Sequence, residues 1–217
     1  MTAECIAPIQ GTRARIVRLD ACGVPVTGAG SLIVFDGFVE VAVSPQYEDG
    51  TEYTLKNAQG DFCVNEVGDD LFQHDEVDIQ FCAIDPDAVV ITTGAQLVVT
   101  GAPATGTGFW LKEGKVTARW SFELWQADSQ SCTGTQARYA YWAWPHLSAG
   151  RLSDLTVADD VTEWRIVAKS KKANLAWGAG PGAVKYISTV PANGHRGFNI
   201  VHIDPPAVTG CGATTLT

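Results

Sequence analysis

Apolar and polar residues alternate along several short segments of this chain, and that period of two is the feature that most restricts its fold. The clearest example runs from residue 116 to residue 124. Alternation of this kind is typical of a β-strand with one buried face. We therefore expect a central strand there, with five side chains facing inward: Val116, Ala118, Trp120, Phe122 and Leu124.

Other segments have the composition and spacing of strands and are bounded by turn-forming residues. The dipeptide Asp36-Gly37 suits a tight hairpin because glycine tolerates positive φ, so the strands on either side of it are expected to pair. Pro145 is expected to end the strand before it. The predicted strands cover 13–19, 31–35, 38–43, 77–81, 95–100, 138–144, 161–170 and 199–203.

A single short helix is predicted over residues 86–93. Asp85 can accept hydrogen bonds from the free N–H groups of the first turn, Pro86 suits the first helical position, and Gly94 favours the conformation that ends helices. The whole pattern predicts an all-β fold, an antiparallel sandwich or barrel with one short helix. We expect one domain over 1–217, with unpaired terminal arms at 1–12 and 204–217.

A strongly acidic stretch interrupts the strand pattern. Between Glu48 and Asp87, twelve carboxylates accompany one base, Lys56. Few of them can be buried, since an unpaired charge in the interior is costly. Residues 46–75 are expected to form a long loop, either a solvated acidic surface or an assembly loop that becomes ordered on a partner. Its apolar side chains argue against permanent disorder: Tyr53, Leu55, Phe62, Val64 and Val67.

The charge is divided unevenly along the chain. Residues 1–94 contain sixteen acidic and four basic residues, whereas residues 95–217 contain eight and eleven. The acidic excess disfavours tight binding to nucleic acid, which needs clustered Lys and Arg, but it suits a surface that repels DNA. Opposite charges on different faces favour head-to-tail association, which closes as a ring or continues as a filament.

We therefore predict that the acidic loop of one copy contacts a basic region of another, namely the region from Lys169 to Lys172. The alternative basic region is the strand at 13–19, whose three arginines, Arg13, Arg15 and Arg18, are otherwise expected to form a solvated face. The predicted contact residues are Tyr47, Glu48, Asp49, Glu52, Tyr53, Asp69, Asp70, Lys169, Lys171 and Lys172.

No catalytic or ligand-binding template fits the sequence. The four histidines lack metal-ligand spacing, the six cysteines form no CxxC pair, and neither a phosphate-binding lysine motif nor a GxSxG nucleophile is present. We therefore expect no enzymatic activity, no metal and no cofactor. Most cysteines are expected to be buried thiols in a reducing cytoplasm, with pairing left open if the protein leaves the cell.

The first residues lack the basic and apolar regions of a secretory signal. No apolar run approaches the roughly 20 residues that span a bilayer. We therefore expect synthesis in a cytoplasm and no membrane partner.

The tryptophans suggest a different class of function. All seven lie in the second half of the chain, and Trp142 and Trp144 share one strand face. An exposed pair at this spacing stacks on sugar rings, which would make the protein a carbohydrate-binding or host-adhesion module. The alternative, which we prefer, is that both side chains fill the core or an interface.

Several short motifs stand out along the chain. They are AECIAPIQGTR at 3–13, RLDACG at 18–23, VSPQYEDG at 43–50, NAQGDFC at 57–63, FCAIDPD at 81–87, FELW at 122–125 and WGAGP at 177–181. In these motifs the sequence resembles the major tail proteins of long-tailed phages that infect actinobacteria. The resemblance is dense over residues 3–94 and weaker beyond them.

The resemblance implies a tail tube subunit located in the virion and assembled in the host cytoplasm. Such a subunit is a β-sandwich that forms hexameric rings, which stack into a tube through a long loop and terminal arms. Its expected partners are further copies of itself, the tape measure protein and the tail terminator, with genomic DNA passing an acidic bore without specific binding. The resemblance implies no catalytic residues.

Overall fold

The computed structural model describes residues 5–102, 105–129, 137–153, 164–178 and 190–216. It consists mostly of antiparallel β-sheet, and its described residues form a single short α-helix. The predicted all-β class is therefore confirmed.

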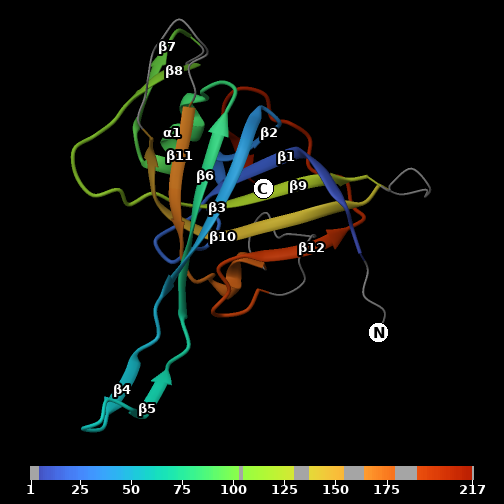
Figure 1. The fold of residues 1–217 in the computed structure, drawn as a ribbon. Coiled ribbons are helices and arrows are strands. Elements are labelled where there is room, and N and C mark those ends of the chain that lie inside the picture. The colour runs from blue at the N-terminus through green and yellow to red at the C-terminus, as the bar shows by residue number, and fades with distance from the viewer. Residues whose placement is uncertain (1–4, 103–104, 130–136, 154–163, 179–189, 217) are drawn as a thin grey trace, which may run out of the picture.

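One large sheet forms the body of the molecule (Figure 1). Its strands follow the order β13-β2-β1-β9-β10-β11-β6-β3, with β12 pairing along part of β10, while β4–β5 and β7–β8 form two separate pairs. The predicted strand at 161–170 is described from residue 164 onward. The bounds are β1 Pro8–Arg18, β2 Gly28–Phe35, β3 Phe38–Glu48, β4 Glu52–Lys56, β5 Phe62–Val67, β6 Leu71–Phe81, β7 Gln96–Thr100, β8 Thr105–Trp110, β9 Arg119–Asp128, β10 Tyr139–Leu152, β11 Trp164–Ser170, β12 Gly197–Val201 and β13 Thr214–Leu216.

The predicted hairpin at Asp36-Gly37 is wrong. β2 pairs with β1 and β13, whereas β3 pairs with β6 at the opposite end of the strand order. The ring centroids of Phe35 in β2 and Phe38 in β3 lie 6.2 Å apart. A Cβ on Gly11 of β1 would lie 2.6 Å from the Phe38 ring. The sheet therefore curls so that the end strand β3 lies near β1 and β2, which it contacts through side chains and not through a backbone ladder.

Strand β10 connects the two parts of the sheet. Its first half pairs with β12 and its second half with β11, while β9 lies along its other edge. Pro145 falls in the register shift between Trp144 and Leu147. Proline is tolerated at such an irregularity because no ladder hydrogen bond from its nitrogen is needed. The prediction that Pro145 ends the strand is therefore wrong, since it lies where β10 changes partner.

The main core lies inside the curl of the sheet. Trp120, Phe122 and Leu124 of β9 are buried there, as the alternation predicts, together with side chains from β1, β2, β6, β10, β11 and α1. The strand begins later than predicted. Val116 is exposed and Ala118 is half-buried, and both precede β9.

A second, smaller apolar cluster involves β9 and β10. The ring centroids of Trp125 on β9 and Tyr141 on β10 lie 5.1 Å apart, and Trp177 of the short 3₁₀ helix Leu175–Gly178 packs with them. Because β9 is covered on both faces, the polar members of its alternation are buried as well, namely Ser121 and Glu123.

The single helix, α1, spans Pro86–Thr93 as predicted. Asp85 Oδ1 accepts a hydrogen bond from the Asp87 N–H at 2.9 Å, and Gly94 ends the helix in the left-handed conformation with φ of 75°. The helix packs closely on β10, where a Cβ on Gly150 would lie 2.1 Å from the Thr92 carbonyl oxygen. Capping residues close in sequence therefore set both helix ends.

Both described terminal segments pair with the body, so the prediction of unpaired arms at 1–12 and 204–217 is wrong for them. β1 begins inside the predicted N-terminal arm, whose first four residues lie outside the described part, and pairs with β9. β13 pairs with β2. Just before β13, the N–H groups of Gly212 and Ala213 donate to Asp85 and Asp87 at 2.7 and 2.8 Å. Carboxylates at the start of α1 thus hold the C-terminal segment on its own chain.

Candidate interaction site: an acidic arm and a basic cleft

The acidic segment at 46–75 is a β-hairpin that projects away from the body (Figure 1). β3 and β6 pair over their whole length, and β4 and β5 then form a separate two-stranded ribbon in which Leu55 lies opposite Val64. We call residues 49–70 the arm. The prediction of an irregular loop is therefore wrong, because paired strands make up most of the segment.

A narrow neck joins the arm to β3 and β6. A Cβ on Gly50 would lie 1.9 Å from the carbonyl oxygen of Gly68, so the two glycines face each other closely. The Gly50 N–H donates to Asp70 Oδ1 at 3.0 Å, and the Gly68 N–H donates to the Thr51 carbonyl at 3.0 Å. The close approach of the two strands at the neck therefore requires glycine at position 50. Asp70, one of the predicted contact residues, already has a hydrogen-bond partner within its own chain.

The arm exposes apolar side chains that the described part of the chain leaves uncovered. Tyr53, Leu55 and Phe62 are 61%, 60% and 56% exposed, and Val64 and Val67 are exposed too. The cross-strand register places Tyr53, Leu55 and Val64 on one face of the ribbon beside Glu66, and it places Phe62 and Val67 on the other face. An isolated two-stranded hairpin has little stability in water. An apolar face on such a ribbon therefore favours burial against another surface.

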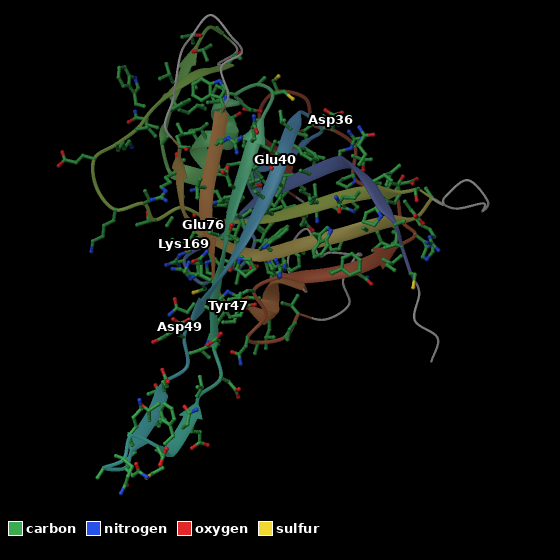
Figure 2. All side chains as sticks on the ribbon, in the orientation of Figure 1. Asp36, Glu40, Tyr47, Asp49, Glu76 and Lys169 are labelled. Atoms are coloured by element: carbon green, nitrogen blue, oxygen red, sulfur yellow. The ribbon has the colours of Figure 1, made fainter. Side chains whose placement is uncertain are left out.

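The predicted tyrosine and acidic contacts lie along the arm and its root (Figure 2). Tyr47 packs edge-on against Phe72, with ring centroids 5.6 Å apart, and Glu48 Oε2 accepts a hydrogen bond from Gln73 Nε2 at 3.0 Å. These two residues thus have partners in their own chain. The remaining predicted acidic contacts are exposed and form no ion pair with any described residue: Asp49, Glu52 and Asp69.

An open cleft of about 760 Å³ adjoins the root of the arm, where Gln73 and His74 of β6 form part of its wall. We call it the basic cleft. Although the chain has 24 acidic residues, none of the described lining residues is a carboxylate. Five cationic side chains line it: Lys115, Arg119, Lys169, Lys171 and Lys172.

The structure brings the three predicted basic contacts, Lys169, Lys171 and Lys172, into this one cleft. All three side chains are exposed and lack an ion-pair partner within the described ranges. Lys169 lies opposite Glu76 in the register of β11 and β6, and both are labelled in Figure 2. The predicted acidic and basic groups therefore form two separate surfaces of the same chain.

The arginines of β1 do not form the solvated face predicted for them. Arg15 is buried and pairs with Glu123. Arg13 pairs with Asp36, with Nη1 and Oδ2 2.9 Å apart, and Arg18 remains exposed. Because Arg15 is buried in its own chain, this strand is a poor alternative surface for the acidic arm.

His146 lines the basic cleft and is buried, at 8% exposure. Its Nδ1 lies 3.3 Å from the Lys172 carbonyl oxygen, so this nitrogen carries the hydrogen and donates. Its Nε2 is buried and has no hydrogen-bond partner in the described structure, and the same is true of His74 Nε2. Burial lowers the pKa of His146, and the charges of Lys171 and Arg119 lower it further, against the effect of the Lys172 hydrogen bond.

A third histidine of the cleft, His195, belongs to a hydrogen-bonded group that sequence reasoning missed. Its Nδ1 lies 2.9 Å from Ser170 Oγ, which accepts from the Asp75 N–H at 2.8 Å. The buried Asp75 carboxylate accepts from Trp144 Nε1 at 3.2 Å and lies 3.5 Å from Arg196 Nη1. Burial lowers the pKa of His195. Ser170 is buried and Asp75 is occupied by other partners, so the group fits a structural network better than a nucleophile.

Trp142 and Trp144 share a face as predicted, with stacked rings whose centroids lie 6.5 Å apart. Trp144 is buried in the main core. Trp142 is half-buried, and its indole N–H donates to Gln126 Oε1 at 2.9 Å. A hollow of about 250 Å³ beside them is also lined by Arg196. Only Trp142 offers ring surface to a sugar, so the pair serves mainly as core packing.

The cysteines differ from expectation. Cys5, Cys22, Cys63, Cys82 and Cys211 are free and exposed, whereas most had been expected to be buried. The sixth, Cys132, lies outside the described residues. Within the described ranges, no group of His, Cys, Asp and Glu has the arrangement of a metal site, and no helix has the length and apolar character needed to cross a membrane.

Comparison with protein-family models gave no match, and comparison with curated proteins gave none either. Membership of the phage tail family therefore stays a prediction from the sequence. The function has to be argued from the arm and the basic cleft.

Proposed function

We propose that this protein is a structural virion subunit that assembles with copies of itself into stacked rings, forming a phage tail tube. The observation that carries the proposal is the arm. It projects from the body, exposes an apolar face containing Tyr53, Leu55 and Val64, and bears several unpaired carboxylates. A surface of this kind is suited to burial in an assembly.

The basic cleft is the complementary surface within the same chain. Its lysines have no ion-pair partner among the described residues, and the arm carboxylates Asp49, Glu52 and Asp69 have none either. In the proposed assembly, the arm of one copy contacts the Lys169–Lys172 region of the next. Apolar burial supplies the affinity, and the opposite charges set the register and reject wrong orientations.

The acidic excess of the chain fits a conduit for DNA. Phosphate contacts with Lys and Arg make nonspecific DNA binding strong, so a bore dominated by carboxylates lets DNA pass without adhering. In this proposal the tape measure protein and the tail terminator are further partners, and hexameric rings are the repeating unit. The protein then resides in the virion tail after assembly in the host cytoplasm.

Removing the arm tests the proposal. Gly50 and Gly68 lie side by side at the neck, so deleting residues 51–67 joins them as a Gly-Gly pair, which suits a two-residue hairpin turn. We expect the full chain at high concentration to form hollow tubes of regular repeat in negative-stain electron microscopy. The shortened chain should keep its circular dichroism spectrum and form none. Tubes from the shortened chain, or a full chain that stays monomeric at every concentration, would contradict the proposal.

A further inference from the structure

We propose that the basic cleft is a binding site for a small phosphate-bearing anion, and that His146 takes up a proton when the anion enters. The site lies within a single chain. Anion binding can therefore be measured on the monomer, whereas in the proposed assembly the arm of the next copy contacts the same lysines and competes with the anion.

The charge of the cleft selects an anion. Five cations line it and none of the described lining residues is a carboxylate, although Glu76 lies opposite Lys169 and Asp20 lies near Arg119. Arg119 is half-buried, and its planar guanidinium presents paired N–H groups that match the oxygens of a phosphate. The cleft is therefore a local concentration of positive charge in a chain with a net charge of −9, and such a concentration attracts anions.

Two histidines that line the cleft each have a buried nitrogen without a partner in the described structure. His146 Nε2 and His74 Nε2 are both buried without a hydrogen bond in the described structure. Native proteins rarely leave buried polar groups unsatisfied, and such atoms often mark the place of a ligand or water. Because the Nδ1 hydrogen of His146 is directed at the Lys172 carbonyl, its Nε2 can donate to an anion only after gaining a proton.

The charged groups around His146 account for its proton uptake. Lys171 and Arg119 disfavour the imidazolium, Asp20 favours it, and burial disfavours it most strongly. An anion held by the same lysine and arginine cancels their repulsion and adds a negative charge beside the ring. Binding therefore raises the proton affinity of His146, and by linkage a lower pH strengthens binding.

The size and neutral lining of the cleft restrict the ligand. Its volume of about 760 Å³ lies in the range of small-molecule sites. Thr117 and Ser148 contribute to its lining beside the cations, and their hydroxyl groups can donate to phosphate oxygens. The site thus fits a phosphate group or a short polyphosphate, either free or carried by a metabolite.

Isothermal titration calorimetry of the full chain tests the inference. Tripolyphosphate is the first probe, and ATP is the second, at constant ionic strength. Equal affinities would show that the cleft recognises a bare phosphate chain, and tighter binding of ATP would show that it recognises a nucleotide. We expect Arg119→Gln and Lys172→Gln each to weaken tripolyphosphate binding about tenfold, the usual effect of losing a charge-assisted hydrogen bond. Lys112→Gln, an exposed lysine that does not line the cleft, is the matched control and should leave the affinity unchanged.

Sulfate tests the proton uptake, because its own charge stays constant near neutral pH. Titrations in two buffers with different ionisation enthalpies should show a proton taken up by the wild-type chain, with affinity about tenfold higher near pH 6 than near pH 8. In His146→Asn the side-chain amide can still donate to the Lys172 carbonyl, and the pH dependence should shrink. If that variant does not fold, the two-buffer measurement on the wild type still shows whether a histidine of the cleft takes up a proton, and the absence of uptake rejects the role of His146.

Three results would overturn the inference. The first is the absence of saturable tripolyphosphate binding stronger than about 10 mM. The second is that Arg119→Gln and Lys172→Gln bind tripolyphosphate as tightly as the control Lys112→Gln does. The third is sulfate binding without proton uptake, which would reject the role of His146.

Discussion

Arg15 and Glu123 pair inside the sheet, directly opposite each other on β1 and β9, and both side chains are buried. Arg15 Nη2 donates to Glu123 Oε1 at 2.7 Å, and the Tyr141 hydroxyl donates to the same oxygen at 2.5 Å. The Trp125 ring centroid lies 5.7 Å from the guanidinium carbon. The two buried charges thus compensate each other, and Glu123 also accepts the neutral hydrogen bond from Tyr141.

Replacing Glu123 with Gln should leave the Arg15 guanidinium buried without a counter-charge. We expect the free energy of unfolding to fall by about 3–5 kcal/mol, measured by urea denaturation. The control is Asp36→Asn at the Arg13–Asp36 pair, where the aspartate side chain is 62% exposed. That loss should be at most about 1 kcal/mol. Equal losses in the two variants would contradict the assignment of Glu123 to a buried pair.

Gly150 should tolerate no side chain. A Cβ there would lie 2.1 Å from the backbone oxygen of Thr92 in α1, so Gly150→Ala must push the helix away from β10. We expect a loss of about 1–3 kcal/mol in thermal or urea unfolding. Gly108→Ala is the control, because its Cβ would meet only Val98 at 3.9 Å. A Gly150→Ala protein as stable as this control would show that the helix does not contact β10 as closely.

The stability of the protein should fall on mild acidification because of His146. Its pKa in the folded protein is lowered from the ordinary value of 6.5, mainly by burial. The unfolded chain therefore binds the proton first, and stability that is complete above pH 6.5 is lost as the pH falls toward the folded pKa.

Urea unfolding midpoints measured across this range should show the loss, and His146→Asn should reduce the slope. Part of the slope should remain, because the pKa of His195 is lowered as well. An identical slope in His146→Asn would contradict the role assigned to His146.

The apolar face of the arm should matter for assembly and not for folding. Leu55→Ser with Val64→Ser changes exposed residues of one ribbon face, so the melting temperature should stay the same while tube formation is lost. Thr54→Ala with Asn65→Ala changes the opposite face of the same strands and is the matched control. Light scattering against concentration measures the effect. Assembly equally reduced in both variants would reject a face-specific contact.

Features determined by neighbours in sequence could be predicted. The helix bounds follow from Asp85, Pro86 and Gly94, which act on the turns beside them. The inward side chains of β9 from Trp120 to Leu124 follow from alternation. Strand pairing was harder to predict, because Asp36-Gly37 has a favourable hairpin composition, yet β3 pairs with β6 and not with β2.

In the candidate site, too, features local in the sequence could be predicted, whereas contacts between distant segments could not. The acidity of the arm and the lysines at 169–172 are visible in the sequence, and in the structure these lysines line the basic cleft. Arg119, His146 and His195 come to the cleft from segments far apart along the chain, so no local pattern could assign them. The buried partner of Arg15 could not be predicted for the same reason, since Glu123 lies 108 residues away.

The contact between the arm of one copy and the basic cleft of another is tested most directly by reversing charge in the cleft. Lys171→Glu with Lys172→Glu should abolish tubes in negative-stain microscopy and leave a monomer in sedimentation velocity. Lys112→Glu with Arg151→Glu changes the net charge equally at exposed positions that do not line the cleft, and this control should still assemble. Normal tubes from the cleft variant, or loss of tubes in both, would contradict the contact.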